Sequence, residues 1–397
     1  MGLVARLVLA FAPGHSYDIF TFTAWADSLA KHGAWGVADA PKPPDYLPGY
    51  LYVLWLFGEL RAWLGISDGV FAYMLKVPGI AADMASAVLL YALLKDLPER
   101  RRMTAVLIYL ALPPVLFVGA LWGQVDSILS LLLLLTIYFL GRKRLTAAAV
   151  TYAVAFVVKP QAMAAFPAFV IWAWRDYPWR EVWRACAIAG VVGFALILPF
   201  FPTNPLEVVR QLARMSDEYQ YNGLHVFNFW SMDGWRIPDG KITLGADWRT
   251  WALLLTIMAY IPILRAIARA RGTAALALGV AACVLVFYTF QTRMHERYLF
   301  SALLPMLAAC AMYNDRRLWT AFAALSTFQF VALCWAYGDV ITPGAFARAL
   351  DWSPPGWRLD VSLVVYALSV IGTAISLALM TLTVSLLRKP RESNVPS

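Results

Sequence analysis

The chain has 397 residues, of which 61% are hydrophobic and only 14% are charged. Soluble domains carry about 25% charged residues, so this composition excludes a soluble globular protein and predicts a polytopic membrane protein. The net charge of +9 does not indicate nucleic-acid binding, because the basic residues fall in short clusters between apolar segments. All four cysteines lie in apolar segments and are expected to be small buried side chains, not disulfides or metal ligands.

The N-terminal part of the chain alternates between short apolar and polar segments. Residues 1–12 are apolar but too short to cross a hydrocarbon core of about 30 Å, so they are either an incomplete first span or mark a start placed too late. Residues 13–46 are predicted to form a polar loop. Residues 47–64 are apolar and aromatic but contain Glu59 and Arg61, which favours a helix along the membrane surface. The alternative is a true span.

The rest of the chain contains apolar runs that are separated by polar or basic residues. We expect an all-α polytopic membrane helix bundle with about 11–12 transmembrane helices and one juxtamembrane helix, in a single domain over residues 1–397. Residues 13–64 would form the first outer loop with its surface helix, and residues 203–248 the largest outer loop. The predicted spans lie near residues 72–94, 104–121, 126–141, 145–158, 161–174, 183–201, 250–268, 273–290, 298–313, 318–337 and 361–387.

Basic residues are distributed unevenly between the two sets of loops. One set, together with Arg6 and both termini, holds most of the Lys and Arg, whereas the other holds more Asp and Glu than Lys and Arg. The basic side is expected to be cytoplasmic, which places both termini there. The polar segments that then converge on the outer face carry Asp18, Asp45, residues 203–248, residues 293–297 and residues 338–358.

Two early carboxylates are candidates for chemistry. Asp18 ends the segment Gly14-His15-Ser16-Tyr17-Asp18 and can act as a general base if a hydroxyl lies within hydrogen-bond reach. The alternative for Asp18 is a solvated or capping side chain. Asp45 follows two prolines that fix an extended entry into the next helix, so it either caps that helix or serves the site.

Charged residues also occur inside or between the spans. Lys76 and Asp83 are seven residues apart on one helical face, and buried charges need partners, so the two are expected to form a structural pair. Residues 291–298 read Gln-Thr-Arg-Met-His-Glu-Arg-Tyr. Cations gathered at a bilayer surface suit a phosphate group, and a His beside a Glu suits proton transfer. The alternative is an ordinary basic loop.

The ordered set of these motifs resembles the C-type (GT-C) integral-membrane glycosyltransferases. The resemblance is closest to the prokaryotic Gpi18-like predicted mannosyltransferases and more distant to the dolichol-pathway glucosyltransferases. It covers residues 13 to about 300, whereas the last hundred residues carry no recognised motif. A complete first helix precedes the early Asp in that family. The motifs are Asp18, Asp45-Tyr46-Leu47-Pro48, Lys76 with Asp83, Gly123-Gln124-Val125-Asp126, Lys159-Pro160-Gln161 and His295-Glu296-Arg297-Tyr298.

The resemblance implies transfer of a hexose, with mannose favoured, from a polyprenyl-phosphate donor to an acceptor on the outer face, with inversion. Asp18 would be the catalytic base. The leaving phosphate would be bound by Arg293, His295, Arg297 and Lys159. Residues that would bind the sugar or acceptor, or support the site, are Asp45, Tyr46, Glu296, Gln124, Asp126 and Gln161.

Two other classes of function remain open from the sequence. A transporter or lipid flippase would place charges near the bilayer middle, as Lys76 and Asp83 suggest, but would also show repeated halves, which are absent. A non-catalytic membrane scaffold is the other alternative. No cofactor is firmly implied, although a divalent cation at Asp18, Asp45 or Asp126 stays open. The sequence names neither the sugar nor the acceptor, a glycan, glycolipid or protein.

Overall fold

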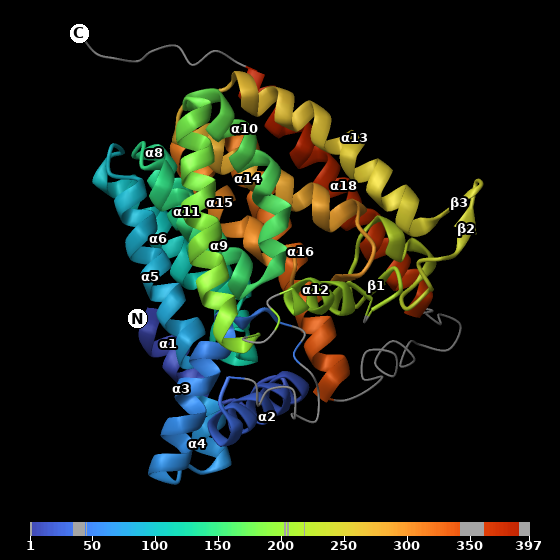
Figure 1. Ribbon diagram of the computed structural model, residues 1–397. Helices are drawn as coiled ribbons and strands as arrows, with labels where there is room; N and C mark the ends of the chain where they lie inside the picture. The colour runs from blue at the N-terminus through green and yellow to red at the C-terminus, as the bar shows by residue number, and fades with distance from the viewer. Residues whose placement is uncertain are drawn as a thin grey trace.

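The computed structural model describes residues 2–34, 44, 46–201, 204, 206–217, 219–341 and 361–388. Within these residues the predicted all-α bundle is confirmed, since helices account for nearly all of the regular structure (Figure 1). The α-helices are α1 (Gly2–Ala10), α2 (Ser16–His32), α3 (Pro48–Leu64), α4 (Asp68–Met74), α5 (Val77–Leu93), α6 (Glu99–Ala111), α7 (Pro113–Val115), α8 (Asp126–Gly141), α9 (Leu145–Val158), α10 (Phe166–Asp176), α11 (Trp179–Ile197), α12 (Glu207–Asp217), α13 (Trp248–Arg269), α14 (Thr273–Phe290), α15 (Leu303–Tyr313), α16 (Arg316–Ile341) and α18 (Val361–Arg388).

Shorter elements connect these helices. A π-helical segment, η2 (Leu116–Trp122), follows α7, and the 3₁₀ turns are η3 (Pro160–Ala165), η4 (Leu198–Phe200), η5 (Phe229–Asp233) and η6 (Phe300–Ala302). Two very small sheets occur in the loop between α12 and α13 and in the loop after α14. In one of them β1 (Gly223–Leu224) pairs in parallel with β4 (Met294–His295), and in the other β2 (Ile242–Thr243) pairs antiparallel with β3 (Ala246–Asp247).

The central helix of the bundle is α14. Every residue from Ala274 to Val286 is buried, and the helix is apolar on all sides, as expected for a helix in the core of a membrane bundle. The neighbouring helices α8, α10, α13, α15 and α18 pack around it (Figure 1). Because α14 ends at Phe290, the polar residues 291–297 begin where the central helix stops.

Every predicted apolar segment coincides with one helix or with two or three consecutive helical elements. Fewer of them than the expected 11–12 are long and apolar enough to cross a membrane. Within the described residues these are six helical segments, and the pair α6 with α7–η2, bent by 49°, makes up to 7. Shorter apolar helices lie at α8, α9 and residues 300–313. Exposed side chains such as Val191 and Phe194 give the outer helices a lipid-facing surface.

The prediction of a polar loop over residues 13–46 is wrong for its first half, which forms α2. The helix carries Phe22, Trp25 and Leu29 at spacings of three and four residues, and all three side chains are buried. The polar residues of α2 lower the average hydropathy of the segment, so a hydropathy window does not detect the helix. The predicted helix over residues 47–64 is confirmed as α3, which is absent from the segments that could span a membrane.

Two glycines of α3 set the position of α2 relative to the bundle. A Cβ at Gly58 would overlap the backbone carbonyl of Ala26 in α2, so the two helices touch at the backbone. A Cβ at Gly49 would lie 2.6 Å from the backbone nitrogen of Val158 at the end of α9. Only glycine allows both approaches. The start of α2 is therefore held close to the residues that follow α9.

The expected pairing of Lys76 with Asp83 is wrong, because each residue has its own partner. The Lys76 ammonium donates hydrogen bonds to the carbonyls of Ala10, at 2.9 Å, and Ala12. Asp83 accepts a hydrogen bond from Arg6 at 3.0 Å, and both side chains are fully buried. Arg6 is thus not a surface charge as the orientation argument assumed. The charges that best suited a transporter hold α1 against α5 instead.

Candidate active site

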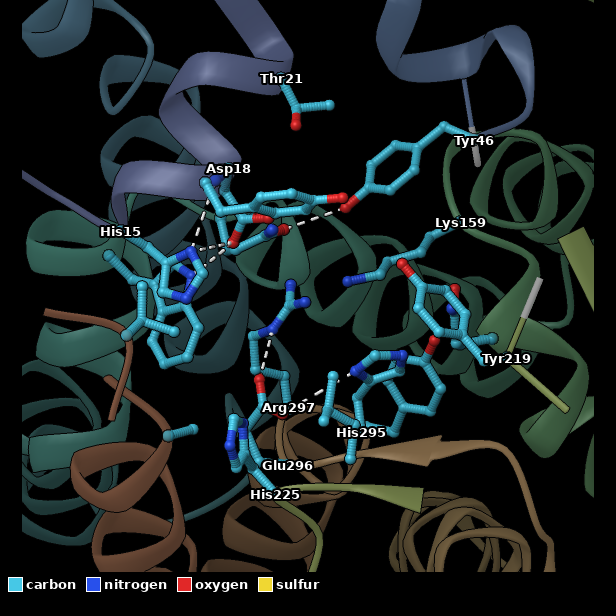
Figure 2. Close-up of a pocket in the computed structure, with 18 of the residues that line it drawn as sticks. His15, Asp18, Thr21, Tyr46, Lys159, Tyr219, His225, His295, Glu296 and Arg297 are labelled. Atoms are coloured by element: carbon cyan, nitrogen blue, oxygen red, sulfur yellow. Dashed lines mark hydrogen bonds and ion pairs between the residues drawn. The ribbon is translucent and has the colours of Figure 1, made fainter. Parts of the chain in front are cut away.

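A cavity of about 440 Å³ lies where α2, residues 291–297 and the loop after α12 meet. It collects residues that are far apart in the sequence, and Figure 2 shows several of them facing one another. The early carboxylate and the late cationic cluster therefore share one cavity. The sequence-predicted residues that line it are Asp18, Tyr46, Gln124, Lys159, Gln161, His295, Glu296 and Arg297.

Asp18 lies in the first turn of α2, and its carboxylate is held by neighbouring donors. Trp122 donates its indole N–H to Oδ2 of Asp18 at 2.6 Å. Nδ1 of His15 lies 3.1 Å from the same oxygen, and the His15 ring stacks on Trp122 at 4.5 Å between centroids. Trp122 ends the π-helical segment η2, a kind of irregularity that often occurs at functional sites.

The electrostatic surroundings of Asp18 favour its ionised form. Burial raises the pKa of the carboxyl, but the Arg297 guanidinium and the hydrogen bonds from His15 and Gln124 outweigh it and hold the pKa well below its usual range. Asp18 is therefore a carboxylate at any physiological pH.

Arg297, Glu296, Lys159 and Asp126 form a buried charged cluster. Lys159 Nζ donates to Asp126 Oδ1 at 2.6 Å, and Arg297 Nε donates to Glu296 Oε1 at 2.9 Å. Arg297 Nη1 lies 3.8 Å from Asp126 Oδ2, and neither atom has a hydrogen-bond partner among the described residues. Figure 2 shows the Arg297 guanidinium reaching into the space between Asp18 and Lys159. A buried guanidinium with an unused donor is suited to bind an anion.

His295 has a different charge state from its neighbour Arg297. It is held in β4, which pairs with β1, and its ring makes an edge contact with Tyr219 at 4.9 Å between centroids. Burial lowers the pKa of His295 to about 4, since the nearby Glu296 does not compensate for it and Arg297 lowers it further. His295 is therefore a neutral hydrogen-bonding group at pH 7, not a cation.

Two predicted site residues, Arg293 and Asp126, do not line the cavity. Arg293 donates to Asp239 at 2.6 Å and lies 3.1 Å from Asp217, so its guanidinium joins the end of α12 to the loop that follows it. Asp126 lies behind Lys159 as its ion-pair partner. Asp45 lies outside the described residues, as does most of the predicted outer segment 338–358.

Several lining residues were not predicted from the sequence. His15 stands in the same short segment as Asp18, and Thr21 follows Asp18 by three residues, so a correct prediction of α2 would have put all three together. His225 and Arg236 come from the loop after α12. That loop has no helical or strand periodicity, and only tertiary structure brings these two side chains to the cavity.

The described residues contain no group of three or more His, Cys, Asp or Glu side chains that could hold a metal ion. Asp18 and Asp126, two of the three carboxylates considered for a divalent cation, are instead engaged with Trp122 and Lys159.

Comparison with solved structures shows the class of fold. The chain is similar to ArnT from Cupriavidus metallidurans in the apo state, with 16% sequence identity and a TM-score of 0.53, over 97% of this chain and 74% of that one. It is also similar to the same protein bound to undecaprenyl phosphate, with 15% identity and a TM-score of 0.52, over 97% and 76% of the two chains. No curated protein sequence matches the chain.

The fold and the motifs define a multi-pass membrane glycosyltransferase of the GT-C class, which confirms the resemblance inferred from the sequence. Within that class the chain belongs to the ALG3 protein family, whose profile matches residues 120–336. The matched part begins just before Trp122 and ends in α16. It includes Lys159 and residues 291–297 but not Asp18.

Proposed function

We propose that the protein transfers mannose from a polyprenyl-phosphate-linked donor to an acceptor hydroxyl at the outer face of the membrane, with inversion at the anomeric carbon. The ALG3 family is a dolichol-pathway mannosyltransferase family, which favours mannose. The similarity to an ArnT structure that contains undecaprenyl phosphate supports the class of donor. The acceptor is a glycan, a glycolipid or a protein that bears a free hydroxyl.

The observation that carries this proposal is the shared cavity of Asp18 and Arg297. A glycosyl transfer from a lipid phosphate needs a base for the acceptor and a cation for the leaving group, on opposite sides of one sugar. The cavity offers an ionised carboxylate from α2 and a guanidinium from the loop after α14. These groups lie at one end of the bundle, where a lipid-linked donor and a polar acceptor can both arrive.

In the proposed reaction the acceptor hydroxyl gives its proton to an Asp18 carboxylate oxygen. The acceptor oxygen forms a bond to the anomeric carbon from the face opposite the phosphate. The bond between that carbon and the phosphate oxygen breaks, and its electron pair leaves with the lipid phosphate. The phosphate gains one negative charge, which the Arg297 guanidinium stabilises, while neutral His295 donates or accepts a hydrogen bond.

Donor binding would also make Asp18 a better base. The positive charge of Arg297 is one cause of the low pKa of Asp18. A phosphate bound beside Arg297 offsets that charge, so the pKa of Asp18 rises towards the value that suits a general base. The carboxylate would then gain proton affinity only when a donor is present, which couples acceptor activation to donor binding.

Replacement of Asp18 by Asn tests the assignment of the base. We expect Asp18→Asn to lower the turnover of polyprenyl-phosphate mannose by about 100-fold or more, because a positioned general base contributes about that much. Turnover is measured as released lipid phosphate from purified protein. The matched control is Asp27→Asn, in the same helix but paired with Arg61 outside the cavity. Near-normal transfer by Asp18→Asn in a folded protein would remove Asp18 from this role.

The same assay tests the sugar when the wild-type protein is given polyprenyl-phosphate mannose, glucose and arabinose in parallel. We expect the mannose donor to have the highest kcat/KM. A higher value for glucose or arabinose would contradict the choice of sugar and leave the reaction class standing. Absence of lipid phosphate release from all three donors with a range of acceptors would contradict the reaction class itself.

A further inference from the structure

We infer that Arg236 binds the phosphate of the lipid-linked donor and of the lipid phosphate that is released. This inference rests on the proposed function and adds a residue that the sequence motifs do not contain. Arg236 lies in the outer loop between η5 and β2, far from Lys159 and residues 291–297 in the sequence. It takes the role that the sequence had suggested for Arg293.

The cations that the sequence motifs suggested for phosphate binding are each paired with a carboxylate. Lys159 is paired with Asp126, Arg297 with Glu296, and Arg293 with Asp239. These pairs offset part of the positive charge of the cations that the sequence motifs suggested for phosphate binding. The side chain of Arg236 lines the same cavity and is exposed. The structure records no hydrogen bond or ion pair for its guanidinium with any described residue.

The backbone of Arg236 has an unusual conformation, with a φ of 60°. This left-handed conformation is unfavourable for a residue with a Cβ, and such residues persist where the surrounding structure imposes them. The Arg236 N–H donates to the carbonyl of Gly223 at 3.1 Å. The next N–H, of Ile237, donates to Oδ1 of the fully buried Asn222 at 3.0 Å. The loop therefore holds Arg236 in a fixed and strained position.

The loop that carries Arg236 is attached to residues 291–297. Gly223, which accepts the hydrogen bond from Arg236, is paired with Met294 in the β1–β4 sheet. The guanidinium of Arg293 binds Asp239, three residues after Arg236. Arg293 is thus a positioning residue, since it holds the segment that carries Arg236 against the segment that carries His295 and Arg297.

The chemistry of the leaving group fits an unpaired guanidinium at this place. The phosphate of the donor carries one negative charge, and the departing lipid phosphate acquires a second. A guanidinium can donate two parallel hydrogen bonds to phosphate oxygens, and its interaction strengthens as the charge grows. Arg236 would then act together with Arg297, which lines the same cavity, and it would bind the released lipid phosphate more tightly than the donor.

The test compares binding of undecaprenyl phosphate with binding of undecaprenol, which lacks the phosphate. In the purified full-length protein, Arg236→Gly should weaken binding of undecaprenyl phosphate by about 10- to 100-fold, the range for a charge-assisted hydrogen bond. Binding of undecaprenol should not change. The Tm should stay equal or rise, because glycine adopts a positive φ without strain. Arg249→Gln, an exposed arginine at the start of α13, is the control for general charge effects.

The other outcomes separate a failure of this inference from a failure of the proposed donor class. Unchanged phosphate binding by Arg236→Gly overturns the inference, and so does an equal loss of undecaprenyl phosphate and undecaprenol binding with a lower Tm. A wild-type protein that binds undecaprenyl phosphate no better than undecaprenol contradicts the proposed donor class, which is a separate failure. Arg293→Gln should lower the Tm as well as phosphate binding, as a positioning role requires, whereas an unchanged Tm would contradict that role.

Discussion

His295 and Arg297 are two residues apart in one loop, yet burial has opposite consequences for their charges. Arg297 remains a cation, since the carboxylates of Asp18, Glu296 and Asp126 outweigh the cost of burial and hold its pKa well above the usual value. The imidazole of His295 loses its proton instead. The positive charge available to a substrate in this loop therefore comes from Arg297, although the sequence suggests both residues as phosphate-binding cations.

The neutral state of His295 predicts a pH dependence of stability. Its pKa is about 4 in the folded protein against 6.5 for the free side chain, so the unfolded state binds a proton at a higher pH than the folded state. The free energy of unfolding should therefore fall as the pH drops from about 6.5 to about 4, by roughly 3 kcal/mol, and this effect is absent above neutral pH. The measurement is the Tm in detergent at pH 7.5 and 5.0.

The matched variant for this prediction is His295→Gln, which keeps a polar side chain but cannot titrate. Wild-type protein should lose more Tm between pH 7.5 and 5.0 than the variant does. Equal losses in the two proteins would show that His295 does not contribute to acid sensitivity, and the neutral, buried imidazole would have to be abandoned.

At the scale of elements, the position of Asp18, the proposed base, depends on the contact between α2 and α3. Gly58 of α3 lies against the backbone of Ala26, two turns beyond Asp18 in α2. Gly58→Ala should push the helices apart, so both the Tm and the turnover should fall, the latter by about 10-fold or more because small misplacements are costly in catalysis. The measurements are thermal unfolding and lipid phosphate release.

The control for this variant is Gly69→Ala in α4, where an added Cβ meets nothing within 4 Å. It should leave Tm and turnover within error of the wild-type values, or slightly raise the Tm through helix propensity. If Gly58→Ala behaves like Gly69→Ala, then α2 is not held by its contact with α3.

The helices differ in how far the sequence predicts them. The apolar helices could be predicted because hydropathy over a window of residues is a local property. The helix α2 could not be predicted in that way, since Asp18 and Asp27 offset the apolar stripe of Phe22, Trp25 and Leu29. That stripe was nevertheless visible as a spacing of three and four residues, so a search for helical periodicity would have found it.

At the scale of the whole molecule, the ends of the bundle carry different chemistry. The cavity lies near α2 and α12, whereas Lys143, Asp176 and Arg271 form a cluster of ion pairs at the opposite end, near the ends of α8, α10 and α13 (Figure 1). The excess of Lys and Arg on that side predicts that it faces the cytoplasm and that the cavity faces outward.

Labelling of introduced cysteines in intact cells tests this orientation. In a protein with Cys186 replaced by Ser, a membrane-impermeant maleimide should label Gly240→Cys, which is exposed in the outer loop. It should label Arg142→Cys, after α8, only once the cells are permeabilised. The reverse pattern would place the cavity on the cytoplasmic side and would contradict the proposed location of the reaction.

The meeting of distant residues is the part of the site that local sequence patterns could not supply. Asp18 and residues 295–297 were placed together through the resemblance and their outward-facing loops. No local sequence pattern distinguishes Arg293 from Arg236 as the proposed phosphate-binding residue, because both are loop arginines of the same charge. They are distinguished by the ion pairs of Arg293 with Asp239 and Asp217, and by the cavity, which Arg236 lines and Arg293 does not. Partner choice among charged side chains is a tertiary property, as the separate partners of Lys76 and Asp83 also illustrate.

The enclosure of α14 by other helices affects how the protein adapts to membranes of different thickness. Bilayers vary by a few ångströms in hydrocarbon thickness, and helices in contact with lipid adjust by tilting. The outer helices α11 and α13, with exposed Val191 and Met258, would take up that adjustment. Residues 291–297 are attached to a helix that is shielded from lipid by its neighbours. The depth of Arg297 relative to the bilayer midplane is thus set by the interior of the protein, not by the length of the surrounding acyl chains.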